Sequence, residues 1–547
     1  MFTYITYVKK KLFNGNCILY FVTLDGNNKK YMKSLYFTEE HELFRQSVRQ
    51  FVEKEIKPFG NQWEKEEKIS RDLFLKLGEQ GFLGINHDEA YGGSKADIFY
   101  TCAYLEELAK SGYAGVCAAV SVHQYMATNH IAEAGNHELK ERFLRPSIEG
   151  KKVGAIAITE PFGGSDVQSM RTTAHKEGDY YIINGSKTFI TNGHFCDFVV
   201  VACKTDSNAG INGISLIVVE RGTPGFSSSQ LKKIGWHSSD TGELAFDNVK
   251  VPVSNMVGKE GMGFFYVMES FQIERLVAGI LGVGGGEQCL EETLKYMNER
   301  EAFGRQIKKF QVLRHEIVQL YTELEAGKQM TYNACWLVQN GEIPVKEASM
   351  VKLYMTELGN KIVDKCLQMF GGYGYMEDFP IARAYRDARV GTIVGGTTQI
   401  MREILAKIII DDVRYKKVYS EVAEIKTDNG NQTNEKTDWG NPKTAKEIIQ
   451  SIPLRIKKDK AANYSTVFQF DISGDNGGQF TLTVNNGEAI VEDGLNGTPE
   501  CIVTTDAKVY EDIELGRMDP TMAFMGGQIR VTNIGAMMQF AKYFHRI

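Results

Sequence analysis

The sequence lacks paired cysteines, long apolar runs and clusters of basic residues, and each absence excludes a class of protein. Its nine cysteines are odd in number and scattered without a Cys-x-x-Cys pair, which is typical of reduced thiols and not of a disulfide scaffold. No run approaches the ~18 apolar residues that a spanning helix requires, so we predict no transmembrane segment. The net charge is only -6, which argues against a nucleic-acid partner.

Two common cofactor motifs are incomplete. His315-Glu316 begins like a zinc-helix motif, but Gln319 stands where the second histidine would be needed, so we predict no metal site. Gly372-Tyr-Gly374 is followed by Glu377 in place of a third glycine, which disfavours a nicotinamide-binding domain.

The hydrophobic pattern changes several times along the 547 residues, which are too many for one compact core. Thr38 and Ser70 are typical helix N-caps before apolar residues at helical spacing. Short apolar runs between Gly and Asn turns follow, and then long helical patterns, among them Gln311 to Gln339 and Val345 to Phe370. We predict an N-terminal extension (1–36), a helical domain (37–152), a middle β domain (153–255), a second helical domain (256–415), a linker (416–444) and an α+β domain (445–547).

The first residues do not resemble a targeting signal. Lysines and a short apolar run occur there, but no small-residue cleavage site and no Arg-rich amphipathic pattern. We interpret residues 1–31 as an unstructured extension or as sequence upstream of a start at Met32. The predicted location is the cytoplasm, with the mitochondrial matrix as the less favoured alternative.

The stretch from Ala157 to Ser169, Ala-Ile-Thr-Glu-Pro-Phe-Gly-Gly-Ser-Asp-Val-Gln-Ser, has the composition of a ligand cradle. Gly163 and Gly164 let the backbone approach a ligand closely, and Thr159 and Ser165 add hydroxyl groups. The alternative is a tight Gly-Ser turn between strands. A second stretch, Tyr181 to Gly193, combines a predicted hairpin turn at Asn184-Gly185 with a strand that carries Phe189 and Thr191.

Together these two stretches resemble the paired flavin-contacting strands of the acyl-CoA dehydrogenase family. The resemblance continues through Arg300-Glu-Ala-Phe-Gly304, Gln311, Gln368-Met-Phe-Gly-Gly-Tyr-Gly374 and Gly395-Gly-Thr-Thr-Gln399, and so covers roughly residues 37 to 415. It implies the family's fold, with an N-terminal α-helical domain, a middle β-barrel and a C-terminal four-helix bundle. It also implies the cofactor FAD, and in such an enzyme the flavin carries out the redox step.

The resemblance assigns the FAD contacts residue by residue. They are Ile158, Thr159, Gly164, Ser165, Phe189, Ile190, Thr191, Arg300, Phe303, Gln311, Gln368, Gly371, Gly372, Thr397 and Gln399. In the family, the positions of Arg300, Phe303 and Gln311 reach the FAD of a neighbouring subunit. We therefore expect a homo-oligomer, a tetramer or at least a dimer.

The family reaction removes the α-proton of an acyl-CoA with a carboxylate while the β-hydrogen leaves as hydride to the flavin. Most members carry the base in a Glu-Gly-Thr step, but here that step reads Val394-Gly395-Gly396-Thr397. In the long-chain and isovaleryl members the acid sits on an earlier helix, directly before an arginine, and Glu274-Arg275 matches that place. We therefore predict Glu274 as the base, and Ser165, Phe271, Arg275, Gly395 and Gly396 as substrate contacts, with the Gly395 N–H polarising the thioester carbonyl.

The C-terminal segment resembles the sterol carrier protein-2 fold in Met525-Gly-Gly-Gln-Ile-Arg-Val531 and Asn533-Ile-Gly-Ala-Met-Met538. Its predicted elements include a strand at Ile529 to Val531 and helices at Pro520 to Met525 and Gly535 to Phe544. We predict a lipid or acyl-CoA carrier, because pliable methionine side chains suit an adaptable apolar cavity. The alternative is that these methionines are ordinary core.

The resulting hypothesis is an FAD-dependent acyl-CoA dehydrogenase that converts a medium- to long-chain acyl-CoA to the trans-2-enoyl-CoA. An electron-transfer flavoprotein is the expected acceptor. The alternatives are an acyl-CoA oxidase, which would return electrons to oxygen, and a non-catalytic acyl-CoA or lipid-binding protein.

Overall fold

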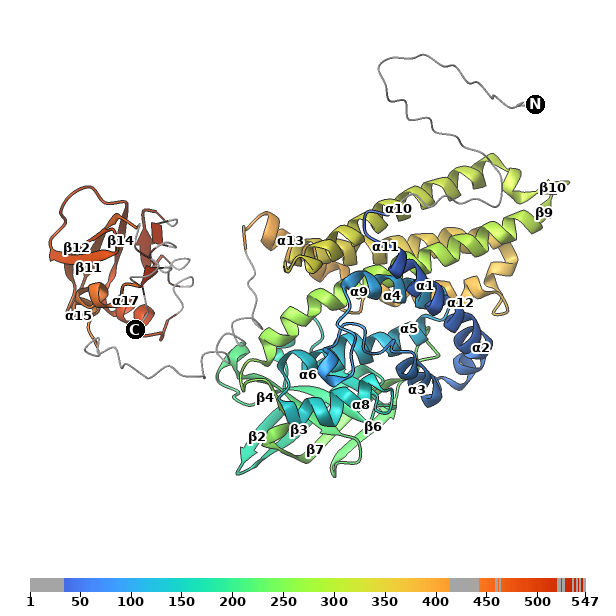
Figure 1. Ribbon diagram of the computed structural model, residues 1–547, viewed down its shortest axis with the longest axis horizontal. Coiled ribbons are helices and arrows are strands. Elements are labelled where there is room, and N and C mark those ends of the chain that lie inside the picture. The colour runs from blue at the N-terminus through green and yellow to red at the C-terminus, as the bar shows by residue number, and fades with distance from the viewer. Residues whose placement is uncertain are drawn as a thin grey trace, which may run out of the picture. The chain divides into compact units, whose positions relative to one another are not determined.

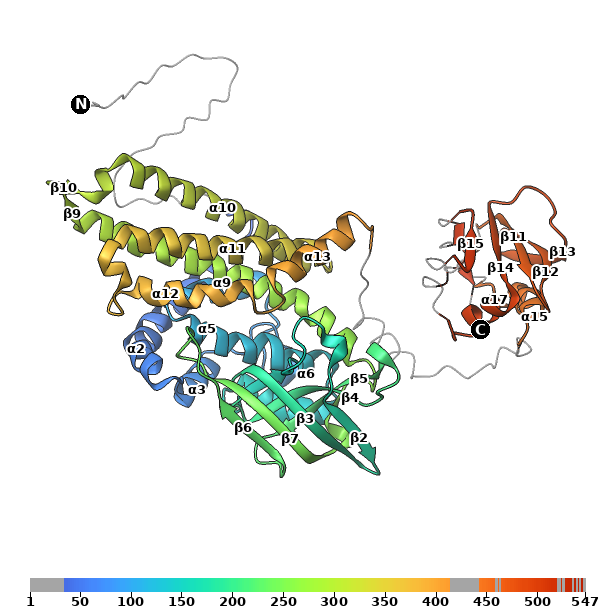
Figure 2. The same ribbon diagram turned by 180° about the vertical axis from the view of Figure 1, so that it is seen from behind.

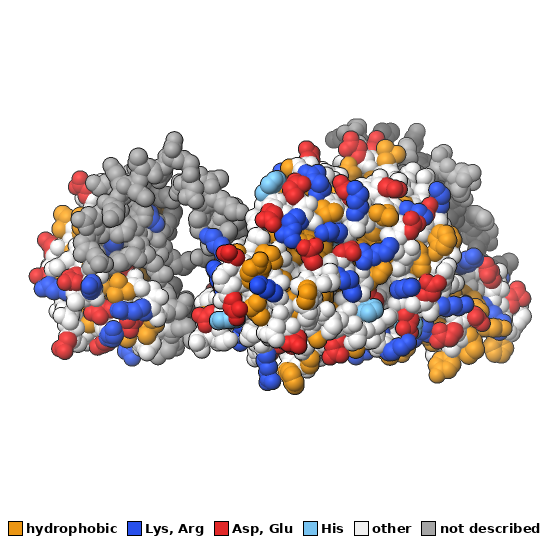
Figure 3. Space-filling model, turned by 90° about the horizontal axis from the view of Figure 1, so that it is seen from below, with side chains coloured by type: hydrophobic (Ala, Val, Ile, Leu, Met, Phe, Trp, Pro, Cys, Tyr) orange, Lys and Arg blue, Asp and Glu red, His pale blue; other side chains and the backbone are white. Residues whose placement is uncertain are grey.

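The computed structural model describes residues 34–413, 442–457, 461, 464–518, 523, 527–533, 536–537, 540 and 543–544. It divides into two units, Met1–Thr427 and Asp428–Ile547, each with its own hydrophobic core (Figure 1). Most of the predicted extension and linker lies outside the described residues, as do most of the helices predicted at Pro520 to Met525 and Gly535 to Phe544. Within the described ranges, no helix is long and apolar enough to cross a membrane. Acidic and basic side chains are interspersed over the face that Figure 3 shows.

The first unit begins with a helical layer. Thr38 and Ser70 are N-caps as predicted, because their side chains accept hydrogen bonds from the N–H groups of His41 and Asp72. The α-helices are α1 (Glu39–Phe51), α2 (Lys57–Glu66), α3 (Arg71–Glu79), α4 (Ile98–Ala109), α5 (Ala114–Ser121), α6 (Thr128–Ala134), α7 (His137–Leu139) and α8 (Arg145–Ile148). Between them lie the π-helical segments η1 (Val52–Ile56), η3 (Val122–Ala127) and η4 (Lys140–Leu144), and the 3-10 turn η2 (Glu89–Tyr91).

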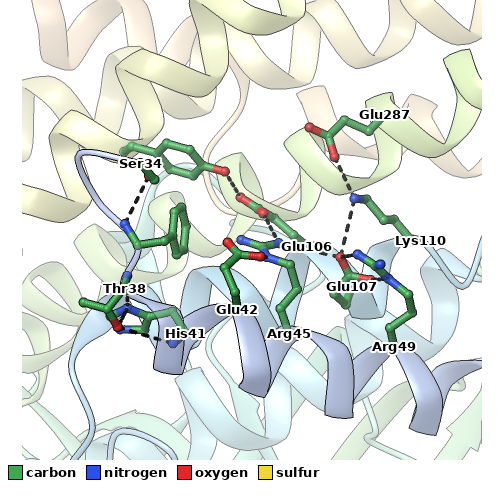
Figure 4. A network of polar contacts seen from close by, with 12 residues as sticks. Ser34, Thr38, His41, Glu42, Arg45, Arg49, Glu106, Glu107, Lys110 and Glu287 are labelled. Carbon is green, nitrogen blue, oxygen red and sulfur yellow. Dashed lines mark hydrogen bonds and ion pairs between the residues drawn. The ribbon is translucent and has the colours of Figure 1, made fainter. Parts of the chain in front are cut away.

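A polar network ties this layer to the later helices (Figure 4). Arg45 of α1 donates to Glu106 of α4 at 2.6 Å, and Glu106 also accepts from the Tyr332 hydroxyl at 2.5 Å. Lys110 pairs with Glu287 at 2.8 Å. Glu106 is only 1% exposed, so its two partners supply the hydrogen bonds that a buried carboxylate needs.

The middle of the chain forms one eight-stranded sheet, which confirms the predicted β domain. The strands are β1 (Gly154–Ala157), β2 (Thr173–Glu177), β3 (Tyr180–Thr191), β4 (Phe198–Lys204), β5 (Ile214–Glu220), β6 (Phe226–Gln230), β7 (Thr241–Pro252) and β8 (Met256–Val257). Their order is β6-β7-β3-β2-β4-β5-β8, and β1 pairs with β4 in parallel. β4 and β5 are buried along almost their whole length, as their unbroken apolar runs indicate.

The hairpin turn predicted at Asn184-Gly185 is wrong. β3 runs straight through these residues, with a register shift against β7 between Ile183 and Gly185. Gly185 has φ +147°, and a Cβ there would lie 2.5 Å from the Thr172 hydroxyl oxygen. The glycine therefore serves a bulge and a close approach of the chain, and not a reversal of its direction.

Long helices return after the sheet. They are α9 (Gly263–Glu299), α10 (Gln311–Gln339), α11 (Val345–Phe370), α12 (Pro380–Ala388) and α13 (Thr398–Ile409), with the short strands β9 (Glu301–Ala302) and β10 (Arg305–Gln306) after α9. α10 and α11 have the predicted bounds. Figures 1 and 2 show α9, α10 and α11 running alongside one another. At Gly284 a Cβ would lie 2.3 Å from the carbonyl oxygen of Glu106, so the backbones of α4 and α9 touch there.

The second unit is a five-stranded sheet with helices. It contains α15 (Ala445–Gln450), the 3-10 turn η11 (Ile452–Arg455), β11 (Thr466–Ser473), β12 (Gly478–Asn485), β13 (Glu488–Asp493), β14 (Cys501–Asp506), α17 (Ala507–Glu514) and β15 (Ile529–Val531). The strand order is β13-β12-β11-β14-β15, with β11 and β14 parallel. β15 has the predicted bounds, whereas β13 and β14 were not predicted because few of their residues form an apolar alternation.

Candidate functional site

The structure joins the two predicted cradle segments directly. Ile158 and Thr159 follow β1, and the Thr188 N–H of β3 donates to the carbonyl of Thr159 at 2.9 Å. The Lys187 ammonium donates to the carbonyl of Ile158 at 3.0 Å. Ile158 and Thr159 therefore lie beside Phe189, Ile190 and Thr191, as predicted from the sequence.

A buried ion pair holds the cradle loop closed. Lys187 is 0% exposed and donates to Glu160 at 2.9 Å. Glu160 also accepts from the N–H groups of Arg171 at 2.6 Å and Thr172 at 2.9 Å. Burial alone would raise the pKa of Glu160, but Lys187 and these donors hold that pKa below its usual range. The charged pair thus pins both ends of the segment that carries Gly164 and Ser165.

Phe189 is held in an unusual conformation for a bulky residue. Its φ is +61°, within a register shift between Lys187 and Ile190, and its side chain is 70% exposed. The left-handed region costs an L-residue ~1–2 kcal/mol, so the surrounding sheet imposes it. The bulge turns an aromatic ring out of the sheet, where it offers an apolar face to a flat ligand.

The glycine loop leaves its backbone accessible. A Cβ on Gly164 would meet only the Thr159 methyl group, at 3.8 Å, and Ser165 is exposed. Backbone N–H groups and hydroxyls at such an open turn suit an anionic group, and the aromatic face of Phe189 suits a ring system. The residues present therefore fit FAD, whose pyrophosphate and ring would need these two kinds of contact.

Glu274 lies on α9 in a nearly dry environment. It is 8% exposed, and the Ser270 hydroxyl donates to it at 3.2 Å. Burial raises its pKa to about 7, while the Ser270 bond and the Arg275 charge act in the opposite direction. Arg275 is 5% exposed, donates to the Gln272 side chain at 3.1 Å and has its guanidinium 5.8 Å from the centre of the Phe271 ring. A carboxyl with this pKa suits general-base chemistry at neutral pH.

The Gly395-Gly396 turn precedes α13. Both glycines have positive φ, +64° and +92°, and a Cβ on Gly395 would meet nothing within 4 Å. Thr397 caps α13 by accepting from the Ile400 N–H at 3.2 Å, and Gln399 follows on the first turn of the helix. The Lys352 ammonium of α11 donates to the carbonyl of Gly396.

The remaining predicted FAD contacts gather elsewhere. Arg300 follows α9 with its guanidinium 5.6 Å from the centre of the Tyr373 ring, and Phe303 is 94% exposed with φ +52° at the tip of the β9–β10 hairpin. The other members are Gln311 at the start of α10, Gln368 near the end of α11, and Gly371 and Gly372 just beyond it. Figures 1 and 2 place the hairpin at one end of the helical bundle and α13 at the other. The structure therefore separates the predicted contacts on and around the β9–β10 hairpin from those at the start of α13.

Sequence reasoning missed Glu160, Lys187 and Lys352. Glu160 and Lys187 lie inside the two quoted motifs, and for Lys187 a charged residue on the buried face of a strand was an available signal. The sequence contains no signal for Lys352, because a single lysine in a helix is ordinarily solvated. Within the ranges that the structure describes, no group of three or more His, Cys, Asp or Glu side chains could hold a metal ion.

Domain models of known families match almost all of the described chain. Models described as "Acyl-CoA dehydrogenase" match at residues 38–151 (N-terminal domain), 155–249 (middle domain) and 261–410 (C-terminal domain). The model described as "SCP-2 sterol transfer family" matches residues 445–545.

Individual relatives agree with these matches. The long-chain specific mitochondrial acyl-CoA dehydrogenase of Rattus norvegicus is 40% identical over 379 residues, which is 69% of this chain and 88% of that protein. The CarC subunit of the caffeyl-CoA reductase-Etf complex of Acetobacterium woodii is 36% identical, over 69% of this chain and 100% of that protein. The crystal structure of the acyl-CoA dehydrogenase of Geobacillus kaustophilus has a TM-score of 0.67 and 42% identity, over 69% of this chain and 99% of that one.

Proposed function

The chain belongs to the acyl-CoA dehydrogenase family, and on that premise we propose that Glu274 removes the α-proton of a medium- to long-chain acyl-CoA. As a member of this family, the protein is an FAD-dependent oxidoreductase with an acyl-CoA substrate, and it carries an SCP2 domain at its C-terminus. Bound FAD supplies the redox chemistry by accepting the β-hydrogen as hydride, which leaves the trans-2-enoyl-CoA.

The observation that carries the assignment of the base is the buried carboxyl of Glu274, whose pKa is raised to about 7. A general base works best when its pKa lies near the working pH. The position that most family members use for the base is Gly395 here, so no second carboxylate would compete with Glu274 for the same proton. The N–H of Gly395 donates to no acceptor in the described part of the chain and is available to polarise the thioester carbonyl.

FAD would be held by residues from two subunits. One chain would supply Ile158, Thr159, Gly164, Ser165 and Phe189 to Thr191, together with Thr397 and Gln399. The β9–β10 hairpin lies at the end of the bundle opposite α13 (Figures 1 and 2). A neighbouring chain would therefore supply the contacts on and around it, which are Arg300, Phe303, Gln311, Gln368, Gly371 and Gly372. Phe303, an exposed aromatic ring in a strained conformation, is the kind of residue that an interface stabilises. We propose a homo-oligomer, a tetramer or a dimer, on this basis.

We also propose that an electron-transfer flavoprotein accepts the electrons. A relative that is 36% identical is a subunit of a reductase-Etf complex, which supports this class of partner. The alternative acceptor is oxygen, as in an acyl-CoA oxidase.

The deciding experiment is an anaerobic titration of the purified protein with a panel of saturated acyl-CoA chain lengths. The absorbance of the oxidised flavin should bleach with the preferred chain lengths, and reoxidation in air should be slow. Rapid peroxide formation on admitting air would favour the oxidase. An unbleached spectrum with every acyl-CoA would contradict the proposed reaction.

A further inference from the structure

Lys352 of α11 is a buried cation that takes no part in the proposed reaction. Its side chain is 1% exposed, although lysine is rarely buried without a counter-ion. The ammonium donates to the carbonyl of Gly396 and forms no ion pair with any residue that the structure describes. A buried charge that is not neutralised destabilises a fold, so the position of Lys352 calls for a reason other than stability.

The surroundings of Lys352 increase the free-energy cost of burying its charge. Burial, together with the like charge of Arg275 on the packed helix α9, lowers the pKa of Lys352 to about 8, and Glu357 of its own helix opposes the shift. Arg275 directly follows Glu274, so Lys352 lies close to the segment that carries the proposed base. Perturbed titratable groups of this kind concentrate at functional sites.

The group that Lys352 holds is part of a turn with few other constraints. Gly395 and Gly396 have no side chains to anchor them, and both adopt positive φ. On one side of the turn, the Val394 N–H donates to the carbonyl of Val390 at 3.0 Å. On the other side, the Thr398 hydroxyl donates to Glu357 at 2.9 Å. The Thr397 hydroxyl accepts from the Ile400 N–H within α13 itself. The Lys352 hydrogen bond to Gly396 instead ties the pair of glycines to a different helix.

We propose that Lys352 is a positioning residue, which holds the carbonyl of Gly396 and thereby aims the Gly395 N–H at the thioester carbonyl of the substrate. This inference rests on the proposed function, because it assigns to the turn a role in polarising an acyl-CoA. A preorganised donor acts only if its direction is fixed before the reaction, and two consecutive glycines cannot fix it themselves.

A structural role for Lys352 makes different predictions. A methionine has a similar length and volume and would fill the same space without a charge. If Lys352 served packing or stability, Lys352→Met would lower the melting temperature, and any loss of rate would follow from loss of fold or of FAD. If Lys352 positions the turn, the same change removes a destabilising charge, and the rate falls while the fold remains.

The test compares the wild-type holoenzyme with Lys352→Met, and uses Lys346→Met as the matched control, because Lys346 lies on the same helix with 45% of its side chain exposed. Thermal unfolding, FAD content and anaerobic stopped-flow flavin reduction over a range of acyl-CoA concentrations would be measured. We expect Lys352→Met to retain FAD, to melt at the wild-type temperature or above it, and to reduce flavin with a limiting rate about 10²-fold lower. The half-saturating acyl-CoA concentration should change by less than about threefold, since the donor acts mainly in the transition state.

Each other outcome would overturn the inference. Flavin reduction by Lys352→Met at the wild-type limiting rate would show that the turn needs no clamp. A variant that fails to fold, melts lower or loses FAD would show that Lys352 is structural. If no acyl-CoA bleaches the flavin of the wild-type protein, the proposed function is rejected. The proposed role of Lys352 is then rejected with it.

Discussion

At the scale of single residues, burial gives Glu274 the properties of a base. Its desolvated carboxyl has a pKa of about 7, whereas an exposed helical glutamate would be ionised far below neutrality and would be a weaker base. Glu274→Gln keeps the shape and the Ser270 contact but removes the proton acceptor. It should retain FAD and acyl-CoA binding and lose flavin reduction by several orders of magnitude, as measured by anaerobic stopped-flow absorbance. Reduction at near the wild-type rate would exclude Glu274 as the base.

A glutamate at position 395, where most family members carry the base, should partly rescue Glu274→Gln. A Cβ on Gly395 would meet nothing within 4 Å, so Glu274→Gln with Gly395→Glu has room for the new side chain. The backbone at Gly395 has φ +64°, which costs a non-glycine residue ~1 kcal/mol or more. We therefore expect partial recovery of flavin reduction. Gly395→Glu alone, with two carboxylates near one substrate, should be slower than the wild type.

The pKa of Glu274 also predicts the pH dependence of the rate. The base must be ionised in the free enzyme, so kcat/KM should fall tenfold per pH unit well below pH 7 and level off above it. The contribution of Glu274 to the free energy of unfolding should change with pH in the opposite direction. Because its folded pKa is raised, its contribution is fully present below the unfolded pKa and is lost as the pH rises through about 7. A flat kcat/KM profile from pH 5 to 8 would contradict the assignment.

Among single residues, those that belong to a recognisable motif could be predicted from the sequence. Glu274 and Gly395 were predicted because the sequence itself shows an acid at one position and the lack of an acid at the other. The burial of Lys352 and its bond to Gly396 depend on how α9, α11 and the turn before α13 pack together. A sequence does not display that packing.

At the scale of elements, the cradle loop depends on the buried pair of Lys187 and Glu160. Removing one partner leaves a buried charge without compensation, which typically costs ~3–5 kcal/mol, whereas removing both costs less. Lys187→Met and Glu160→Gln should each lower the free energy of unfolding more than the double variant does. The FAD dissociation constant should rise in all three variants, since the loop ends are released. Urea unfolding and fluorescence titration with FAD would measure the two effects.

An exposed pair provides the control for that comparison. Lys232 and Glu67 lie 3.0 Å apart, with 85% and 35% of their side chains exposed. Lys232→Met should change stability by less than ~1 kcal/mol and leave FAD binding unchanged. Additive effects of the Lys187 and Glu160 substitutions would show that the buried pair is not coupled.

The predicted elements also show which local signals are reliable. α10 and α11 were predicted with their observed bounds because long helical periodicity ends at clear breaks, Asn340-Gly341 and Gly371-Gly372. Asn184-Gly185 gave an equally strong local signal for a hairpin, but the chain reverses earlier, near Gly178, which has φ +58°. The contact of Gly185 with Thr172 is a tertiary one, and it determined the local structure there.

At the scale of the whole molecule, the C-terminal unit is distinct from the dehydrogenase domains, and we expect it to fold without them. Its sheet and its core are its own. We propose that it carries acyl or lipid ligands and raises the local supply of substrate, since tethering gives effective concentrations of roughly millimolar order. Deleting residues 445–547 should raise KM for long-chain acyl-CoA and leave the rate of the flavin half-reaction unchanged. Steady-state assays across chain lengths would test this, and equal kinetics for every chain length after deletion would count against a supply role.

If the proposed oligomer forms, each active site would combine FAD contacts from two chains. A protein with Glu274→Gln and a protein with Arg300→Ala would each be inactive alone, yet each retains what the other lacks. After dissociation and random reassembly of the mixture, about one quarter of the sites should combine an intact Glu274 with an intact Arg300 from different chains. Inactive parents would thus produce an active hybrid, as in genetic complementation between alleles.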